Sequence, residues 1–203
     1  MSGNRFILTV VGKDHPGIVA GIASTLYEYE CNIQELNQTV LSDEFAMILL
    51  LQPTREIDVH DLDRSLKEKC EKLEVTFTLR EATAVPTSLP SPQAFEKSLS
   101  KRVPGASAPG KDKVIITVIG ADRIGIVAGV TGVLADMNIN IVELTASPHV
   151  IHDASQYAMV ARVEVGDDVD MLALKTALED CARRLSVDID VQNQEIFNAM
   201  HKI

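Results

Sequence analysis

Apolar and polar positions alternate along the chain with two different periods, and each period predicts one kind of element. Residues 6–11 form an almost continuous apolar run, typical of a strand buried within a sheet. Residues 18–26 then place apolar side chains three or four positions apart, which predicts a helix. Two further apolar stretches, 32–41 and 44–51, predict strands joined by a tight hairpin turn at Ser42-Asp43.

The same reading continues to about residue 80. Apolar residues at helical spacing predict a helix over 62–73, and residues 75–80 alternate as in a strand with one buried face. The predicted order is therefore β-α-β-β-α-β. This is the α+β ferredoxin-like unit, an antiparallel sheet with both helices on one face.

A second copy of this pattern follows in the chain. Gly12–Gly21 matches Gly120–Gly129 at an offset of 108, and the register holds through Asn32 and Asn140 as far as Leu36 and Leu144. From Phe45 and Tyr157 onward the offset is 112, so the second copy has gained four residues near 149–155. We predict one domain over 1–83, a Pro/Gly-rich linker over 84–110 and a second domain with a C-terminal tail over 111–203.

Each unit is small for a single core, so we expect the two copies to pack together, within one chain or across a homo-oligomer. The net charge of −10 and the scattered basic residues argue against direct nucleic-acid binding. No apolar run reaches the roughly 20 residues of a membrane span, and the first residues do not resemble a signal peptide. Three isolated cysteines fit a reducing compartment, so we expect a cytoplasmic protein without membrane attachment.

The turn between the first strand and first helix of each copy is the best candidate site. Its glycines, within 12–17 and 120–125, let the backbone approach a bound group, and a helix N-terminus favours a carboxylate. Asn32 and Asn140 open the following strands and offer amide groups. The alternative is purely structural: Asp14 or its neighbour caps the helix, with Pro16 in the first turn.

Other chemistry finds little support in the sequence. No serine, cysteine or lysine lies in a recognisable nucleophile motif, so we predict no catalytic residue and no enzyme activity. The glycines do not match a nucleotide-binding pattern, and no cofactor is expected. His149, His152 and Asp153 resemble a metal cluster, but they fall in the inserted hairpin loop rather than on a helix, so no metal site is predicted.

The Asp-x-Pro-Gly-Ile-Val segment, the Asn-Ile pair at 32–33 and the element order resemble the ACT domain, a family that typically binds amino acids and regulates metabolism. That resemblance implies ligands near the first loop, at an interface between domains. By position, the candidate ligand-binding residues are Asp14, His15, Gly17, Ile18, Asn32, Asp122, Arg123, Gly125, Ile126 and Asn140. The second copy departs from the motif at Ile124, where the first has proline. The Arg123 guanidinium can bind the carboxylate of a ligand, or it is a solvated surface charge.

Over its whole length the chain is similar to the tandem-ACT glycine cleavage system transcriptional repressor family, through residues 32–36 and 42–50. The segment 195–201 instead resembles small single-ACT bacterial proteins. The resemblance implies a regulator that binds an amino acid of the glycine or serine class and acts through a protein partner such as a transcription factor. Two alternatives stay open: a detached regulatory subunit of a metabolic enzyme, and an assembly protein with degenerate sites.

Overall fold

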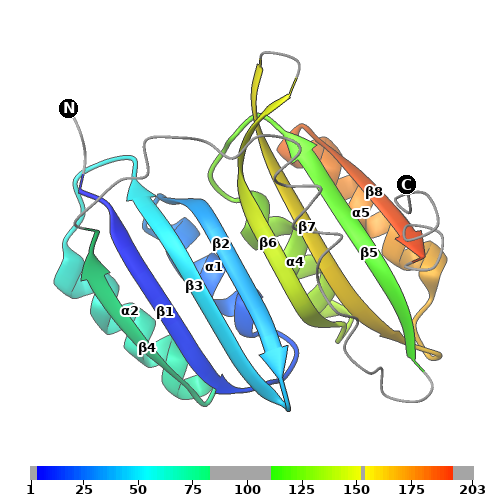
Figure 1. Cartoon of the computed structure of the whole chain (residues 1–203), viewed down its shortest axis with the longest axis horizontal. Helices are drawn as coiled ribbons and strands as arrows, with labels where there is room; N and C mark the ends of the chain where they lie inside the picture. Colours follow the sequence, from blue (N-terminus) through cyan, green and yellow to red (C-terminus); the bar gives the residue numbers. More distant parts are fainter. Residues whose placement is uncertain (1–3, 83–110, 152–153, 194–203) are drawn as a thin grey trace.

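The computed structural model describes residues 4–82, 111–151 and 154–193. Within these ranges it contains two β-α-β-β-α-β units, coloured blue to green and green to red in Figure 1. The first unit comprises β1 (Phe6–Lys13), α1 (Ile18–Glu28), β2 (Cys31–Leu41), β3 (Glu44–Pro53), α2 (Val59–Lys72) and β4 (Val75–Glu81). The second comprises β5 (Lys111–Gly120), α4 (Ile126–Asp136), β6 (Asn140–Ile151), β7 (Ala154–Gly166), α5 (Met171–Leu185) and β8 (Val187–Asn193). The predicted α+β ferredoxin-like order is thereby confirmed in both copies.

The two units share one antiparallel sheet. Its strand order is β4-β1-β3-β2-β6-β7-β5-β8, so β2 of the first copy pairs with β6 of the second (Figure 1). In this joint Leu36 lies opposite Ala146 and Thr39 lies opposite Glu143. We expected the two copies to pack together within one chain or across a homo-oligomer, and the structure shows the packing within one chain.

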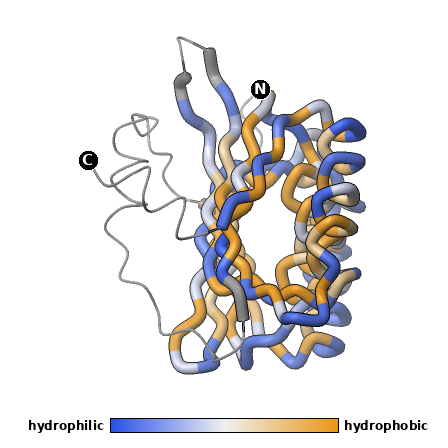
Figure 2. Tube along the Cα trace, turned by 90° about the vertical axis from the view of Figure 1, so that its right-hand side faces the viewer, coloured by the Kyte–Doolittle hydropathy of each residue, from blue (hydrophilic) through white to orange (hydrophobic). Residues whose placement is uncertain are grey.

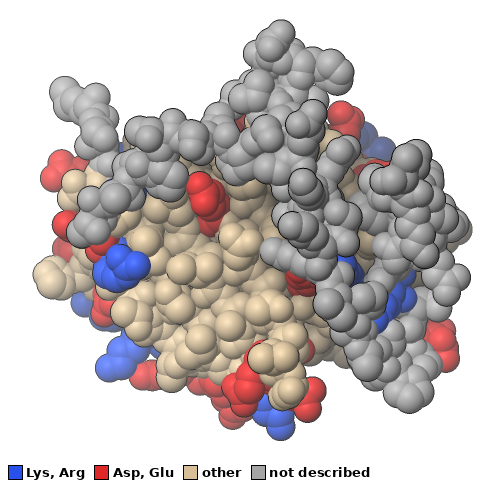
Figure 3. All heavy atoms as spheres, viewed as in Figure 1, with Lys and Arg blue, Asp and Glu red and all other residues tan. Residues whose placement is uncertain are grey.

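The described helices all lie on one face of the sheet, as the side view in Figure 2 shows. Alternate residues of β1, namely Phe6, Leu8 and Val10, point toward the helices and are buried. The helices α1 and α4 pack against each other behind the β2–β6 joint, so the joint has both a sheet and a helix component. The opposite face of the sheet carries few charged side chains over β1, β2 and β3 (Figure 3).

The hairpins confirm one prediction and extend another. Ser42 and Asp43 have φ of 50° and 65°, so the β2–β3 connection is the predicted tight turn of two left-handed residues. In the second copy the equivalent strands run longer, to Ile151 and from Ala154. The four extra residues thus lengthen the hairpin. Residues 152 and 153 at its tip lie outside the described residues, as do 83–110 and 194–203, on which the predictions for the linker and the C-terminal tail fall.

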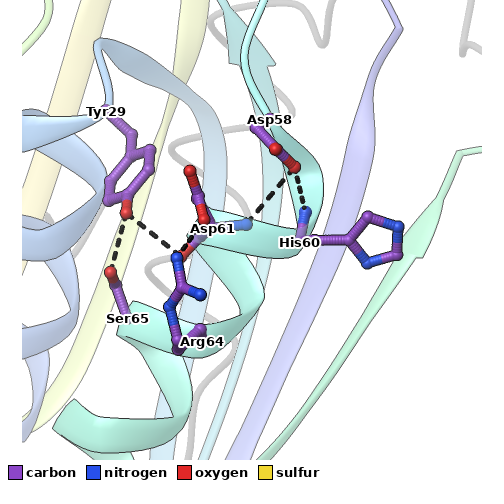
Figure 4. Close-up of polar contacts among 6 residues, drawn as sticks. All are labelled: Tyr29, Asp58, His60, Asp61, Arg64 and Ser65. Carbon is purple, nitrogen blue, oxygen red and sulfur yellow. Dashed lines mark hydrogen bonds and ion pairs between the residues drawn. The ribbon is translucent and has the colours of Figure 1, made fainter.

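A polar cluster fixes the start of α2 and ties the end of α1 to it (Figure 4). Asp58 is the N-cap of α2, and its carboxylate accepts from the backbone N–H of His60 at 2.9 Å. Tyr29, which ends α1, donates its hydroxyl to the Asp61 carbonyl at 3.0 Å and lies 2.7 Å from the Ser65 hydroxyl. Because β2 begins only two residues after Tyr29, this anchor also positions the first residues of β2.

Within the described ranges, no helix is both long enough and apolar enough to cross a membrane.

Candidate functional site

Both first loops end in a glycine with left-handed backbone. Gly17 and Gly125 are the N-caps of α1 and α4, with φ of 94° and 92°, a conformation that L side chains rarely adopt. Neither helix receives a side-chain cap, so the expectation that Asp14 or its neighbour caps α1 is wrong. Pro16 precedes the helix instead of lying in its first turn. The turn at Gly17 leaves the first N–H groups of α1 without a side-chain partner and leaves the Asp14 carboxylate available elsewhere.

The two loop aspartates reach across the joint to the other copy. Asn140 donates its side-chain N–H to Asp14 Oδ2 at 2.6 Å. Reciprocally, Asn32 donates to both carboxylate oxygens of Asp122 at 3.2 Å. The β2–β6 pairing produces this exchange, because it places the start of each of these strands beside the first loop of the other copy. Four of the residues predicted from the sequence thus form two interface pairs.

An irregularity in each strand follows the asparagine directly. The strand register shifts between Ile33 and Glu35 in β2, and between Ile141 and Glu143 in β6. Such bulges bend a strand locally and change where its side chains point. The buried Gln38 donates its side-chain N–H to the Ile141 carbonyl at 3.1 Å, so the first copy also holds the irregular segment of the second.

Two small hollows lie at the interface, one beside each loop glycine. We call the first the Gly17 hollow; it is lined by Asp14, His15, Gly17, Ile18, Val19, Ala20, Phe45, Thr131, Ala135, Ile139, Asn140 and Ile141. We call the second the Gly125 hollow; it is lined by Ala23, Tyr27, Cys31, Asn32, Ile33, Arg123, Gly125, Ile126, Val127, Ala128 and Tyr157. Each hollow therefore takes its loop from one copy and its asparagine from the other. Ile18 and Ile126 are buried, so their side chains form part of the apolar wall.

The two aspartates are partly withdrawn from water. Burial raises the pKa of Asp14 above its ordinary value, although the hydrogen bond from Asn140 lowers it. Burial likewise raises the pKa of Asp122, against the hydrogen bond from Asn32. A partly desolvated carboxylate favours a nearby cation, and at Asp14 the neighbouring His15 already lowers the pKa of the carboxyl in this way. The arrangement can therefore attract a small ammonium group at either hollow.

His15 ties the first loop to the far end of α2. Its Nδ1 lies 2.9 Å from the Pro16 carbonyl oxygen and its Nε2 lies 2.8 Å from that of Leu73, the C-cap of α2. Carbonyl oxygens only accept, so both contacts are hydrogen bonds only when both ring nitrogens carry protons. The Leu73 carbonyl accordingly raises the pKa of His15 most, with a smaller contribution from Pro16. The second copy has Arg123 at this position, so both loops can carry a cation there.

Sequence reasoning missed two residues of the Gly125 hollow. Tyr157 is buried with 2% of its surface exposed, and its hydroxyl has no hydrogen-bond partner among the described residues. Tyr27 lies against Gly125, where an added Cβ would come within 2.8 Å of the ring. The alignment of the two copies carried a signal for both, because it pairs Tyr157 with Phe45 and Tyr27 with Ala135. In each pair the tyrosine lines the Gly125 hollow, and the residue without a phenol lines the Gly17 hollow.

The histidine cluster of the second hairpin is only partly described. His149 is buried on β6, and its Nε2 lies 2.9 Å from the Ser147 hydroxyl. His152 and Asp153 lie outside the described residues. Elsewhere in the described part of the chain, no group of three histidine, cysteine or acidic side chains is close enough together to hold a metal ion.

Known proteins similar to this chain share the same unit. The ACT domain family profile matches residues 4–80 and 112–192. A UPF0237 protein of Lactococcus lactis is 41% identical over 91 residues, which is 45% of this chain and 99% of that protein. A UPF0237 protein of Methanocaldococcus jannaschii is 40% identical over 92 residues, which is 45% of this chain and 98% of that protein.

Solved structures give further likenesses. An ACT domain protein from Streptococcus pneumoniae is 31% identical and covers 41% of this chain and 99% of its own, with a TM-score of 0.38. A structure named as a candidate glycine cleavage system transcriptional repressor is 15% identical and covers 93% of this chain and 96% of its own, also with a TM-score of 0.38. An identity of 15% and a TM-score of 0.38 do not show that this chain acts on the glycine cleavage system. The family profile, in contrast, matches both copies, and the chain therefore belongs to the ACT domain family, as a tandem pair.

Proposed function

We propose that the chain is an amino-acid-binding regulatory protein that binds a small α-amino acid in the hollows between its two ACT domains. The reciprocal Asp14–Asn140 and Asp122–Asn32 pairs are the observation that carries this proposal. Each pair joins a desolvated carboxylate to an uncharged amide at the start of a helix. A zwitterion offers a charged partner to each group: an ammonium group for the aspartate and a carboxylate for the helix N–H groups.

The same contacts suggest how binding is transmitted. In the free protein the Asn140 amide occupies the Asp14 carboxylate across the domain interface. A ligand ammonium competes for that carboxylate, so binding alters the contacts between the two domains. A ligand can shift the domains only by as much as its affinity differs between the two arrangements. We propose that a protein partner, such as a transcription factor, reads this shift, as in a regulator resembling the glycine cleavage system repressor family.

We also propose that the chain forms a homo-oligomer through the open face of the sheet. Val11 and Ile48, which point away from the helices on β1 and β3, are 45% and 46% exposed. The surrounding face carries few charges (Figure 3), although the chain has a net charge of −10. Exposed apolar patches of this kind are typical of interaction surfaces. Sedimentation of the wild-type protein and of an Ile48→Lys variant tests this; a monomer in both cases contradicts it.

Calorimetric titration with glycine, L-serine and the remaining common amino acids tests the ligand. We expect heat of binding and a rise in melting temperature with at least one small amino acid. The matched pair Asp14→Asn and Asp122→Asn keeps side-chain size and removes the charge of one interface pair in each variant, and each should weaken that binding. The absence of heat and of any melting shift across the whole set contradicts the proposal.

A further inference from the structure

The two hollows are built from equivalent positions but differ in chemistry at the wall. Phe45 lines the Gly17 hollow, and Tyr157 lines the Gly125 hollow at the aligned position. Both rings are buried, with 2% of each exposed, so the phenyl part fills the same role in packing. The hydroxyl of Tyr157 is therefore an addition that packing does not require.

That hydroxyl carries a cost in the free protein. It is fully buried, and it forms no hydrogen bond with any described residue. A buried polar group left without a partner destabilises the folded protein, because it has lost its hydrogen bonds to water. Burial raises the pKa of Tyr157, and the carboxylates of Asp122 and Glu35 raise it too, so the hydroxyl stays neutral. Asp122 reaches the same hollow through Asn32, which lines it and donates to the Asp122 carboxylate, so a neutral phenol and a carboxylate are both available to a cationic donor there.

A second phenol covers the same hollow. The Tyr27 ring lies on Gly125, with Cε2 and Cδ2 at 2.8 and 3.0 Å from where a Cβ would stand. Tyr27 is 55% exposed, so its ring lies at the surface and can turn toward solvent without disturbing the core. At the Gly17 hollow the aligned residue is Ala135, and nothing lies within 4 Å of a Cβ built on Gly17. Among the described residues, a ring thus covers the glycine of the Gly125 hollow and none covers Gly17.

Resting on the proposed function, we infer that the two sites are unequal and that the Gly125 hollow is the tighter. There the ammonium group of a small α-amino acid donates to both the Asp122 carboxylate and the Tyr157 hydroxyl, while Tyr27 closes over the ligand. The Gly17 hollow, with phenylalanine and alanine at these two positions, binds the same class of ligand more weakly. Tyr157 and Tyr27 are accordingly specificity-determining residues of the second site.

Three tyrosines and no tryptophan occur in the chain, which makes a direct test practical. The full chain, labelled on its tyrosine rings, is titrated with glycine and with L-serine and followed by NMR. The signals of Tyr27 and Tyr157 should move at the lower ligand concentrations. Tyr29, whose hydroxyl is held by Asp61 and Ser65 on α2, serves as the internal control and should stay in place (Figure 4).

Two conservative variants separate binding from folding. Tyr157→Phe copies the first hollow and removes an unpartnered hydroxyl, so its melting temperature should be unchanged or higher. Its affinity at the tighter site should nevertheless fall about tenfold, which corresponds to 1.4 kcal/mol. Tyr27→Ala should speed ligand dissociation, whereas Tyr27→Phe, which keeps the ring, should not. Phe45→Tyr should leave the tighter site unchanged.

The possible failures are distinguishable. Binding seen by calorimetry, with Tyr27 and Tyr157 signals unmoved and Tyr157→Phe without effect, overturns the inference and leaves the proposed function standing. Two sites of equal affinity, with no loss of affinity in Tyr157→Phe, likewise overturn the inference and leave the proposed function standing. No binding of any amino acid overturns both.

Discussion

Asn140 of the second ACT domain donates its side-chain N–H to Asp14 of the first at 2.6 Å, across 126 positions of sequence. Its counterpart from Asn32 to Asp122 is longer, at 3.2 Å to each oxygen, and more exposed. The two contacts are related by the pseudo-symmetry of the two copies and lie on either side of the β2–β6 joint. They differ enough in length and burial for their contributions to stability to differ.

Removing these contacts should therefore destabilise the chain unequally. Asn140→Ala should lower the free energy of unfolding by about 1–2 kcal/mol, because a partly buried, charge-assisted bond is lost, and Asn32→Ala should cost less. Urea unfolding of both variants measures this. A double-mutant cycle of Asn140→Ala with Asp14→Ala should return a coupling energy of at least about 0.5 kcal/mol. Additive losses in that cycle mean that the contact contributes nothing.

Alanine substitutions at the two loop glycines should also have unequal costs. Each forces a side chain into left-handed backbone, at about 1–3 kcal/mol. Gly125→Ala must in addition displace the Tyr27 ring, whereas the new Cβ of Gly17→Ala has no described atom within 4 Å. We expect Gly125→Ala to be the more destabilising in thermal unfolding. In a Tyr27→Ala background the two substitutions should cost about the same; a persistent difference there excludes the ring as its cause.

Local pattern predicted the elements because each copy repeats the same apolar spacing, and Ser42-Asp43 forms the expected turn. The loop aspartates and strand asparagines were also found from their position in each copy. Their pairing across copies was not predictable, since it depends on β2 and β6 joining edge to edge, and no residue of either strand marks that partner. The capping role expected of Asp14 failed for the same reason: Asn140 supplies an alternative donor from far along the chain.

His15 should make the stability of the first domain depend on pH. Its pKa in the folded chain is raised above the ordinary value, so the stabilisation is fully present below that ordinary value and is lost as pH rises through the raised one. The groups facing it are Asp14 and Glu74, together with the Leu73 and Pro16 carbonyls. His15→Ala should remove about 1 kcal/mol at pH 5.5 and less at pH 8.5. His15→Arg, which copies the permanent cation at Arg123, should abolish the pH dependence; equal losses from His15→Ala at both pH values contradict this account.

Ligand binding should depend on pH through the aspartates in the opposite sense. Because burial raises the pKa of Asp14 and of Asp122, each carboxylate takes up a proton at a higher pH than an exposed aspartate does. A protonated carboxyl no longer attracts an ammonium group, so affinity for glycine or L-serine should fall as the pH is lowered from 7 toward 4. Calorimetric titration across this range measures the change. Asp122→Asn should flatten the pH dependence of the tighter site, whereas Asp14→Asn should leave it in place, and an affinity that does not vary with pH in the wild-type protein excludes both carboxylates as the ammonium partner.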